Sequence, residues 1–290
     1  MSLPSVTGLD HYIVRVNDLE SATELYKKLG FSLAPQGRHH TGTRNQTLIF
    51  DANYIELLYF PPEQLAASRF KSYPPDYQGP VAVALQTTDS AAVRRELAAV
   101  GIQAGELVSG GRPVRLPELP HGSEDAAWLN LSFPNGVFGV PDFFTCGHLT
   151  RHLVFRPEWQ NHENTVRRIE ALIAVHPDPD SLRERYQQAF GSISIGRSDG
   201  DGWLLRRGSL RLRFLTPAAF SRRYGVQPPA SLGEKGWLAG SILGARDIET
   251  TRRVLARNGV ATRSGAKGEI IVDPIHAAGA LQVFVQEIES

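Results

Sequence analysis

Cysteine is almost absent from this sequence, since Cys146 is the single thiol among 290 residues. One thiol excludes an internal disulfide and a metal site built from several cysteines, and we interpret Cys146 as a small buried hydrophobic residue. An excess of one charge is also missing, because 31 Lys and Arg balance 30 Asp and Glu and leave a formal net charge of +1. This balance argues against binding to nucleic acid or to an anionic membrane surface.

Long apolar runs are absent as well. No stretch approaches the roughly 18 consecutive apolar residues that a membrane-spanning helix needs. The first residues do not resemble a signal peptide, which would have a charged start followed by an apolar run. We therefore expect a cytoplasmic protein whose partner is a small molecule rather than a membrane.

The sequence does contain a fourfold repeat. Four times an Asp precedes an amphipathic run that ends at a Gly 12 or 13 residues later, in segments 18–30, 89–101, 178–191 and 247–259. Asp is a good N-cap for a helix, and Gly suits the left-handed residue that ends one. A strand-like run precedes each cap, and about three short apolar runs follow each helix. We therefore predict that one unit of strand, helix and three strands occurs four times.

Such a unit cannot bury both faces of its small sheet, because its helix covers only one of them. We predict an α+β fold in which four βαβββ units pair into two open, barrel-like sheets with the helices outside. The predicted first domain is 1–146, with units at about 8–60 and 80–146, and the second is 147–290, with units at about 165–216 and 236–288. The long connections 60–80 and 216–236 are expected to lie over the surface. Since the units can satisfy one another within one chain, we expect a monomer or a weak homodimer.

Side-chain alternation along a strand places several polar residues of the first unit on one face. In the strand 11–16, His11 and Arg15 share the face opposite to an all-apolar set, so we expect both to point into the concavity. In 54–58, Tyr54 and Glu56 share a face in the same way. Arg15 could bind an acidic group of a substrate or pair with Glu56, and the sequence leaves both possibilities open. For Tyr54, ordinary packing and substrate contact both stay open.

Three segments within residues 8–60 carry a family resemblance: "GLDHYIVRVNDLESATELYKKLGF", "RHHTGTRN" and "YIELLYF". With the repeat, they resemble the vicinal-oxygen-chelate superfamily of glyoxalase I, extradiol dioxygenases and antibiotic-sequestering proteins, and within it the glyoxalase-like branch. The resemblance implies a divalent metal (Zn, Fe, Mn or Ni) at positions that carry His11 and Glu56 here. It also implies that His39 and Asn45, in an H-x-x-G-T-x-N element, face the substrate, although a structural turn is the alternative.

The chain departs from the family pattern where further metal ligands are expected, since a metal site needs at least a third ligand or waters. The positions equivalent to His11 in the other three units carry Ala82, Ala171 (or Glu170, if one inserted residue is allowed for) and Gly240. The equivalent of Glu56 in the second unit is expected near Gly139. The candidates for a third ligand are His121 and His148. No nucleotide cofactor is evident.

These features predict a glyoxalase-like enzyme that acts on a small metabolite with a carboxylate or two vicinal oxygens. Its reaction would be of the lyase, isomerase or oxygenase type, assisted by a metal where one is bound. His11 and Glu56 would be catalytic, with Glu56 shuttling a proton, and Arg15 would orient an acidic group. The loop from about Gly105 to Ala127 is expected to close the site. The alternative is a metal-free protein of the same fold that sequesters a small molecule, and the missing ligands of the second unit favour it.

Overall fold

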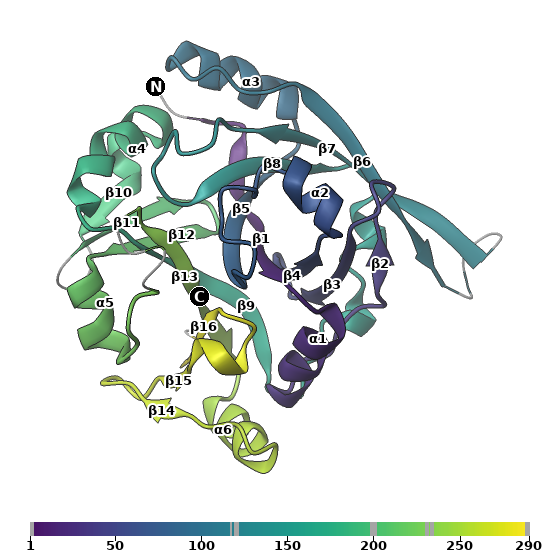
Figure 1. Cartoon of the computed structure of the whole chain (residues 1–290), viewed down its shortest axis with the longest axis vertical. Coiled ribbons are helices and arrows are strands. Elements are labelled where there is room, and N and C mark those ends of the chain that lie inside the picture. The colour runs from purple at the N-terminus through teal and green to yellow at the C-terminus, as the bar shows by residue number, and fades with distance from the viewer. Residues whose placement is uncertain are drawn as a thin grey trace.

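The computed structural model describes residues 3–116, 118, 122–197, 202–229, 232 and 235–287. The first half of the chain forms one eight-stranded sheet with the strand order β2-β3-β4-β1-β5-β8-β7-β6 (Figure 1). Its strands are β1 (Val6–Val16), β2 (Gly37–Arg38), β3 (Arg44–Ile49), β4 (Tyr54–Tyr59), β5 (Gly79–Thr87), β6 (Leu107–Arg115), β7 (Ser123–Ser132) and β8 (Asp142–His148). β1 lies parallel to β4 and antiparallel to β5, so the first strands of two units meet at the centre of the sheet.

The second half repeats this arrangement in the order β10-β11-β12-β9-β13-β16-β15-β14. Its strands are β9 (Val166–Val175), β10 (Ile195–Arg197), β11 (Gly202–Arg207), β12 (Leu210–Leu215), β13 (Trp237–Ala245), β14 (Arg263–Ser264), β15 (Ile270–Val272) and β16 (Leu281–Gln286). β9 lies parallel to β12 and antiparallel to β13, as β1 does to β4 and β5. The predicted α+β fold of four βαβββ units paired into two open sheets is therefore confirmed.

The four repeated helices begin at the predicted caps. They are α1 (Leu19–Lys28), α3 (Ser90–Ala99), α4 (Arg183–Phe190) and α6 (Ile248–Arg257). The capping carboxylates of Asp18, Asp89, Asp178 and Asp247 each accept an amide proton from the following turn. In the third unit this turn is a 3₁₀ segment, Pro179–Leu182, that leads into α4. No helix in the described part of the chain is long and apolar enough to cross a membrane.

The helix-covered faces of the two sheets share one hydrophobic core. Tyr12 of β1 and Tyr26 of α1 are fully buried, and Gln282 of the second sheet donates to both hydroxyls at 2.9 and 3.2 Å. Burial raises the pKa of Tyr12 to about 12, so its hydroxyl keeps its proton and its hydrogen bonds. The domain boundary after residue 146 remains a prediction, and β8 itself runs to His148.

The two long connections do not simply lie over the surface, which corrects the expectation from the sequence. The first contains α2 (Pro62–Ala67) and the second contains α5 (Pro217–Tyr224), and both connections pack apolar side chains against the concave face of a sheet. Figure 1 shows α2 inside the curve of the first sheet. The reason is that Phe70 in the first connection and Phe220 in the second are large apolar residues that gain by leaving water.

Candidate functional site

A cavity of about 540 Å³ lies in the hollow of the first sheet. Strands β1, β3, β4, β6, β7 and β8 line it, together with the loop that follows β2. The lining is mostly apolar and includes Ile13, Leu58, Trp128 and Phe144. Ionisable side chains also line it, among them His11, His39, Glu56, Arg112 and His148. An apolar cavity with a few convergent polar groups is the usual form of a small-molecule site.

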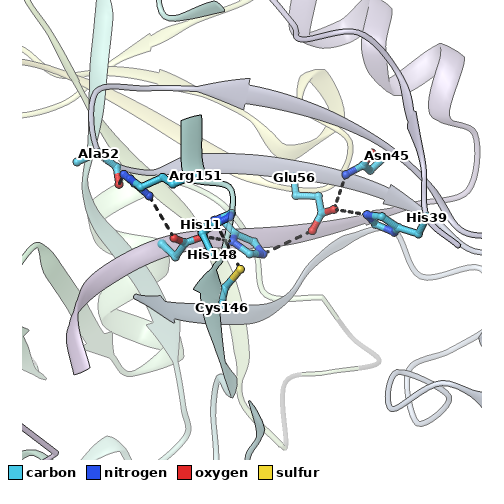
Figure 2. Close-up of polar contacts among 9 residues, drawn as sticks. His11, His39, Asn45, Ala52, Glu56, Cys146, His148 and Arg151 are labelled. Carbon is cyan, nitrogen blue, oxygen red and sulfur yellow. Dashed lines mark hydrogen bonds and ion pairs between the residues drawn. The ribbon is translucent and has the colours of Figure 1, made fainter. Parts of the chain in front are cut away.

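A β-bulge at Asp10 brings two adjacent side chains to this site. β1 gains one residue on β5 between Leu9 and His11, so Asp10 has no partner in the ladder. Bulges of this kind change the direction of a side chain and are frequent beside active sites. Asp10 is completely buried, and its Oδ1 lies 2.7 Å from Nδ1 of His11 and 3.1 Å from Nε2 of His148 (Figure 2).

Asp10 is ionised in this environment. Burial alone would raise the pKa of Asp10, but the neighbouring His148 and His11 outweigh burial and hold it well below its usual range. Arg151 adds a further positive charge, with Nη1 at 3.7 Å from Oδ2. Because an ionised carboxylate can only accept, Nδ1 of His11 must carry the proton. The other ring nitrogen, Nε2, is then left to face the rest of the site.

Nε2 of His11 faces a carboxylate. Strand β4 runs parallel to β1 with Tyr54 opposite His11, and the two rings stack with centroids 4.3 Å apart. Phe144 meets the His11 ring edge-on at 5.5 Å, so the imidazole is held between two aromatic side chains. Nε2 of His11 lies 3.5 Å from Oε2 of Glu56. The predicted meeting of His11 and Glu56 in one hollow is therefore present in the structure.

The H-x-x-G-T-x-N element surrounds the other oxygen of Glu56. Asn45 Nδ2 donates to Oε1 at 2.7 Å, and Nε2 of His39 lies 3.7 Å from the same oxygen. His39 Nδ1 is 2.6 Å from the hydroxyl of Thr43. Burial lowers the pKa of His39, and the positive charge of Arg112 adds to this effect against the attraction of Glu56. Neutral His39 and Asn45 thus position the Glu56 carboxylate from one side while His11 faces it from the other (Figure 2).

The model of the glyoxalase-like domain matches residues 9–190, which is more than half of the chain. The chain belongs to the glyoxalase-like domain family. This match confirms the resemblance to the vicinal-oxygen-chelate superfamily. No functionally curated protein matches the sequence of this glyoxalase-like protein at a significant level.

Solved structures share the fold at low sequence identity. A hypothetical protein from Staphylococcus aureus has a TM-score of 0.64 at 15% identity, covering 97% of this chain and 99% of that one. A mutant of 4-hydroxymandelate synthase from Streptomyces coelicolor has a TM-score of 0.57 at 11% identity, covering 97% and 93%. A xylose isomerase-like TIM barrel/4-hydroxyphenylpyruvate dioxygenase fusion protein has a TM-score of 0.54 at 14% identity, covering 98% and 49%. These matches support the fold and leave the reaction open.

The donor atoms at the polar end fit a divalent metal ion. Asp10, His11 and Cys146 form a buried group with ligand atoms close enough to hold one. Within that group Nδ1 of His11 is already bonded to Asp10, which makes Asp10 the outer partner that orients a histidine ligand. Nε2 of His11 and the carboxylate of Glu56 face each other at 3.5 Å, an arrangement that a cation or a proton would stabilise. A metal held by His11 and Glu56 remains a prediction.

Most of the predicted site residues come together. His11, His39, Asn45, Tyr54 and Glu56 all line the cavity, and so does His148, one of the two candidate third ligands. The other candidate, His121, lies outside the described residues. Whether these residues bind a metal or a substrate remains a prediction.

Arg15 does not pair with Glu56, and whether it binds an acidic group of a substrate remains a prediction. Its Nη2 donates to the carbonyls of Pro74 and Pro75 at 2.7 and 2.8 Å, and its guanidinium lies over the ring of Tyr77 at 5.6 Å. The connection 60–80 folds over this end of β1 and supplies these acceptors, so Arg15 neither pairs with Glu56 nor lines the cavity.

Two further expectations about the second unit need correction. The equivalent of Glu56 is Phe144 rather than a residue near Gly139, because β8 pairs with β5 in the register that β4 has with β1. The segment 105–127 forms most of the β6–β7 hairpin, so one wall of the cavity is a pair of strands rather than a loop. The amide of His40 donates to the carbonyl of Gly111 at 3.3 Å and brings the two ends of the sheet together.

Sequence reasoning missed Asp10 and Arg112, whereas its interpretation of Cys146 as a small buried residue is confirmed. Burial, together with Asp10 and Glu56, raises the pKa of the Cys146 thiol, which lies 3.6 Å from Nε2 of His148. The thiol is therefore protonated and is no nucleophile. A signal for Asp10 was present in the sequence, since it is an acidic residue directly before the strand histidine. Its burial depends on the bulge, which the alternating pattern does not reveal.

Proposed function

We propose that this protein is an enzyme that binds a small substrate through neighbouring oxygen atoms at His11 and Glu56 and moves a proton there. The observation that carries the proposal is the distance of 3.5 Å between Nε2 of His11 and the Glu56 carboxylate beside an apolar cavity. Two proton acceptors in contact are unfavourable unless a positive charge lies between them. Such an arrangement is expected where a cation or a reacting proton belongs to the working state.

Each surrounding residue has a task in this proposal. Asp10 fixes the tautomer of His11, and Asn45 holds one oxygen of Glu56 by its hydrogen bond. Glu56 is the general base, because an ionised carboxylate beside a neutral imidazole can take a proton from a carbon next to the bound oxygens. The aromatic walls exclude water from the charge that develops. A divalent cation held by His11 and Glu56 would stabilise a negative charge on the substrate oxygens.

Lyase, isomerase and oxygenase reactions all fit this arrangement. A second candidate function is a metal-free protein that sequesters a small molecule in the same cavity. It is favoured by the second unit, where Ala82 and Phe144 occupy the positions of His11 and Glu56 and supply no ligand atom. The enzyme is preferred because His11 and Glu56 are buried, oriented by partners and in contact, which a purely apolar binding pocket does not need.

Metal analysis of the protein purified without chelator separates the two functions. We expect roughly one metal ion per chain in the wild type and strong loss in both His11→Ala and Glu56→Gln. Glu170→Gln, which removes an acid from the second sheet, is the matched control and should retain the metal. A metal-free wild type after growth and dialysis with Zn, Fe, Mn and Ni would instead support the sequestering protein.

A further inference from the structure

Arg112 presents a buried positive charge to the cavity. It lies on β6, the last strand of the first sheet, and its side chain lines the cavity with the residue only 5% exposed. Pro113 follows it, which is tolerated on an edge strand and keeps Arg112 extended. Gly110 precedes it by two residues, and a Cβ there would overlap the indole of Trp128. The glycine thus lets Trp128 pack against the strand that carries Arg112.

Within the described residues, the Arg112 guanidinium forms no hydrogen bond or ion pair. Two other arginines of the described chain, Arg15 and Arg69, also have a pKa lowered by burial, but each has acceptors, although Nε and Nη1 of Arg15 and Nε of Arg69 are buried without a partner. Arg15 donates to the carbonyls of Pro74 and Pro75, and Arg69 donates to two carbonyls and to the side chain of Asn135. Burial lowers the pKa of Arg112 too, although Tyr54 and Glu56 act against it. The Arg112 nitrogens, unlike several of Arg15 and Arg69, are not sealed off, so an anion that enters the cavity can reach this unpaired guanidinium.

The geometry points to Arg112 as the receptor for the carboxylate of the substrate, an inference that rests on the proposed function and names its substrate class. Arg112 passes close to Gly37 beside Asn45, the residue that holds Glu56. An acid group on Arg112 therefore lies within one small molecule's length of the His11–Glu56 pair.

The substrate class follows from the polar groups at the two ends of the cavity and from the apolar side chains of its walls. One end of the molecule is a carboxylate, and the neighbouring carbon carries the oxygen that reaches His11 and Glu56. The remainder faces Trp128 and Phe144, so it is apolar and preferably aromatic. The class is a small carboxylic acid that carries a second oxygen, as a 2-hydroxy or 2-oxo acid does, together with an apolar or aryl portion. Arg112 takes the role that the sequence suggested for Arg15.

A purely structural role for Arg112 is the competing explanation. Oδ1 of Asn45 is buried, has no donor and lies beside the Arg112 side chain. A small movement would let Arg112 donate to it and so support Asn45. In that case the loss of Arg112 would weaken every ligand equally, whatever its charge.

Calorimetric titration of the full chain in the presence of chelator tests the inference without depending on a metal. The probes are mandelate, benzoylformate and acetate, with neutral mandelamide as the uncharged match. We expect mandelate to bind the wild type more tightly than mandelamide. Arg112→Gln should weaken mandelate about tenfold to a hundredfold and leave mandelamide unchanged. The mandelate affinity of Arg112→Lys should lie between those of the wild type and Arg112→Gln. Lysine keeps the positive charge but lacks the paired donors of the guanidinium.

Arg115→Gln is the control, because it removes the same charge from an exposed position of the same strand and should leave mandelate affinity unchanged. Equal losses for mandelate and mandelamide in Arg112→Gln would overturn the inference in favour of the structural role. Failure of all three acids to bind the wild type at about 10 mM would overturn it as well. If the acids bind through Arg112 while no metal is found, the proposed enzyme fails and the anion receptor stands.

Discussion

The two sheets have one topology but different hollows. The first keeps a cavity with a polar end, whereas the second is filled by its own connection. In the second hollow Phe220 and Tyr224 of α5 pack with Trp237 of β13 against the concave strands. In the first, α2 brings only the half-buried Leu65 to the equivalent face, and the cavity stays open elsewhere in the same hollow. A duplicated fold has thus kept a ligand-sized space in one copy and used the other for packing.

The two sheets also differ in the residues at the positions of His11 and Glu56. Strand register places Ala171 where the first sheet has His11, and Arg213 where it has Glu56. The second sheet therefore has neither the imidazole nor the carboxylate at these two positions. The chemistry depends on individual side chains on a shared scaffold, so the fold alone does not locate the site.

The acidic bulge residue of the second sheet has a structural role, unlike its equivalent in the first sheet. Glu170 is the extra residue of β9, as Asp10 is of β1. Arg168 donates to Glu170 at 2.7 Å and also contacts Glu287 at 2.7 Å. These charges satisfy one another, whereas Asp10 orients the ring of a histidine whose second nitrogen stays available. The register also settles an ambiguity, since Glu170 corresponds to Asp10 and not to His11.

The largest expected effect comes from the filled hollow. Phe220→Ala should lower the free energy of unfolding by about 3–5 kcal/mol, because it removes a buried ring from the packed face of the second sheet. Leu65→Ala, the matched change on α2, should cost about 1 kcal/mol because its side chain is already half-exposed. Denaturant unfolding measures both. Equal losses would contradict the view that one hollow is packed and the other is kept open.

A second test concerns the position equivalent to His11 in the fourth unit. Gly240 lies seven residues before its cap, and a Cβ there would overlap backbone atoms of Leu281 in the neighbouring strand. Gly240→Ala should therefore destabilise the protein by about 3 kcal/mol through backbone displacement. Gly101→Ala, also at positive φ but in open space, should cost about 1 kcal/mol. If thermal and denaturant unfolding show no difference between the two variants, close backbone packing is not what excludes a side chain from this copy.

The third test uses pH on the connector between the two hollows. His162 accepts the amide proton of Ser32 at Nδ1 and donates from Nε2 to the carbonyl of Ile49, so it is held neutral. Burial lowers the pKa of His162 from 6.5 to about 4. Between these values the unfolded chain binds a proton that the folded chain does not. Stability is therefore lost as pH falls from about 6.5 to about 4, by about 3 kcal/mol for this group.

His162→Asn is the control for this titration. The amide oxygen of Asn can still accept from Ser32, but the side chain does not titrate. Unfolding free energies measured from pH 7 to pH 4 should show a shallower slope in the variant. Parallel slopes in the two proteins would assign the acid sensitivity to other groups, among them His39, whose pKa burial also lowers.

The fold could be predicted because its signals are local and repeated. Each Asp cap, amphipathic helix and closing Gly is a short-range feature, and four copies in register reinforce one another. The meeting of His11 and Glu56 followed from strand alternation together with the family positions. The content of the two connections could not be predicted, since whether Phe70 or Phe220 packs inward depends on the shape of a distant concave face.

The rest of the site depended on register and three-dimensional contact. Asp10 reaches the site only through a bulge, and bulges change the alternation on which the sequence argument relied. Arg15 was placed on the correct strand face, but the chain that covers it supplies its acceptors. Arg112 lies on a strand that approaches His11 only when the sheet curves, so no spacing in the sequence connects the two.

The smallest and most discriminating effect concerns Glu56 itself. In metal-free protein at pH 8, Glu56→Gln should raise the free energy of unfolding by about 1 kcal/mol. The new amide can donate to Nε2 of His11 while its oxygen accepts from Asn45, so the variant removes the contact between two acceptors. Glu170→Gln should instead lower the free energy of unfolding, because it weakens the ion pair with Arg168. If the free energy of unfolding rises in Glu56→Gln and falls in Glu170→Gln, the first hollow sacrifices stability for function. If it falls in Glu56→Gln as well, the imidazole of His11 already shares a proton with the Glu56 carboxylate.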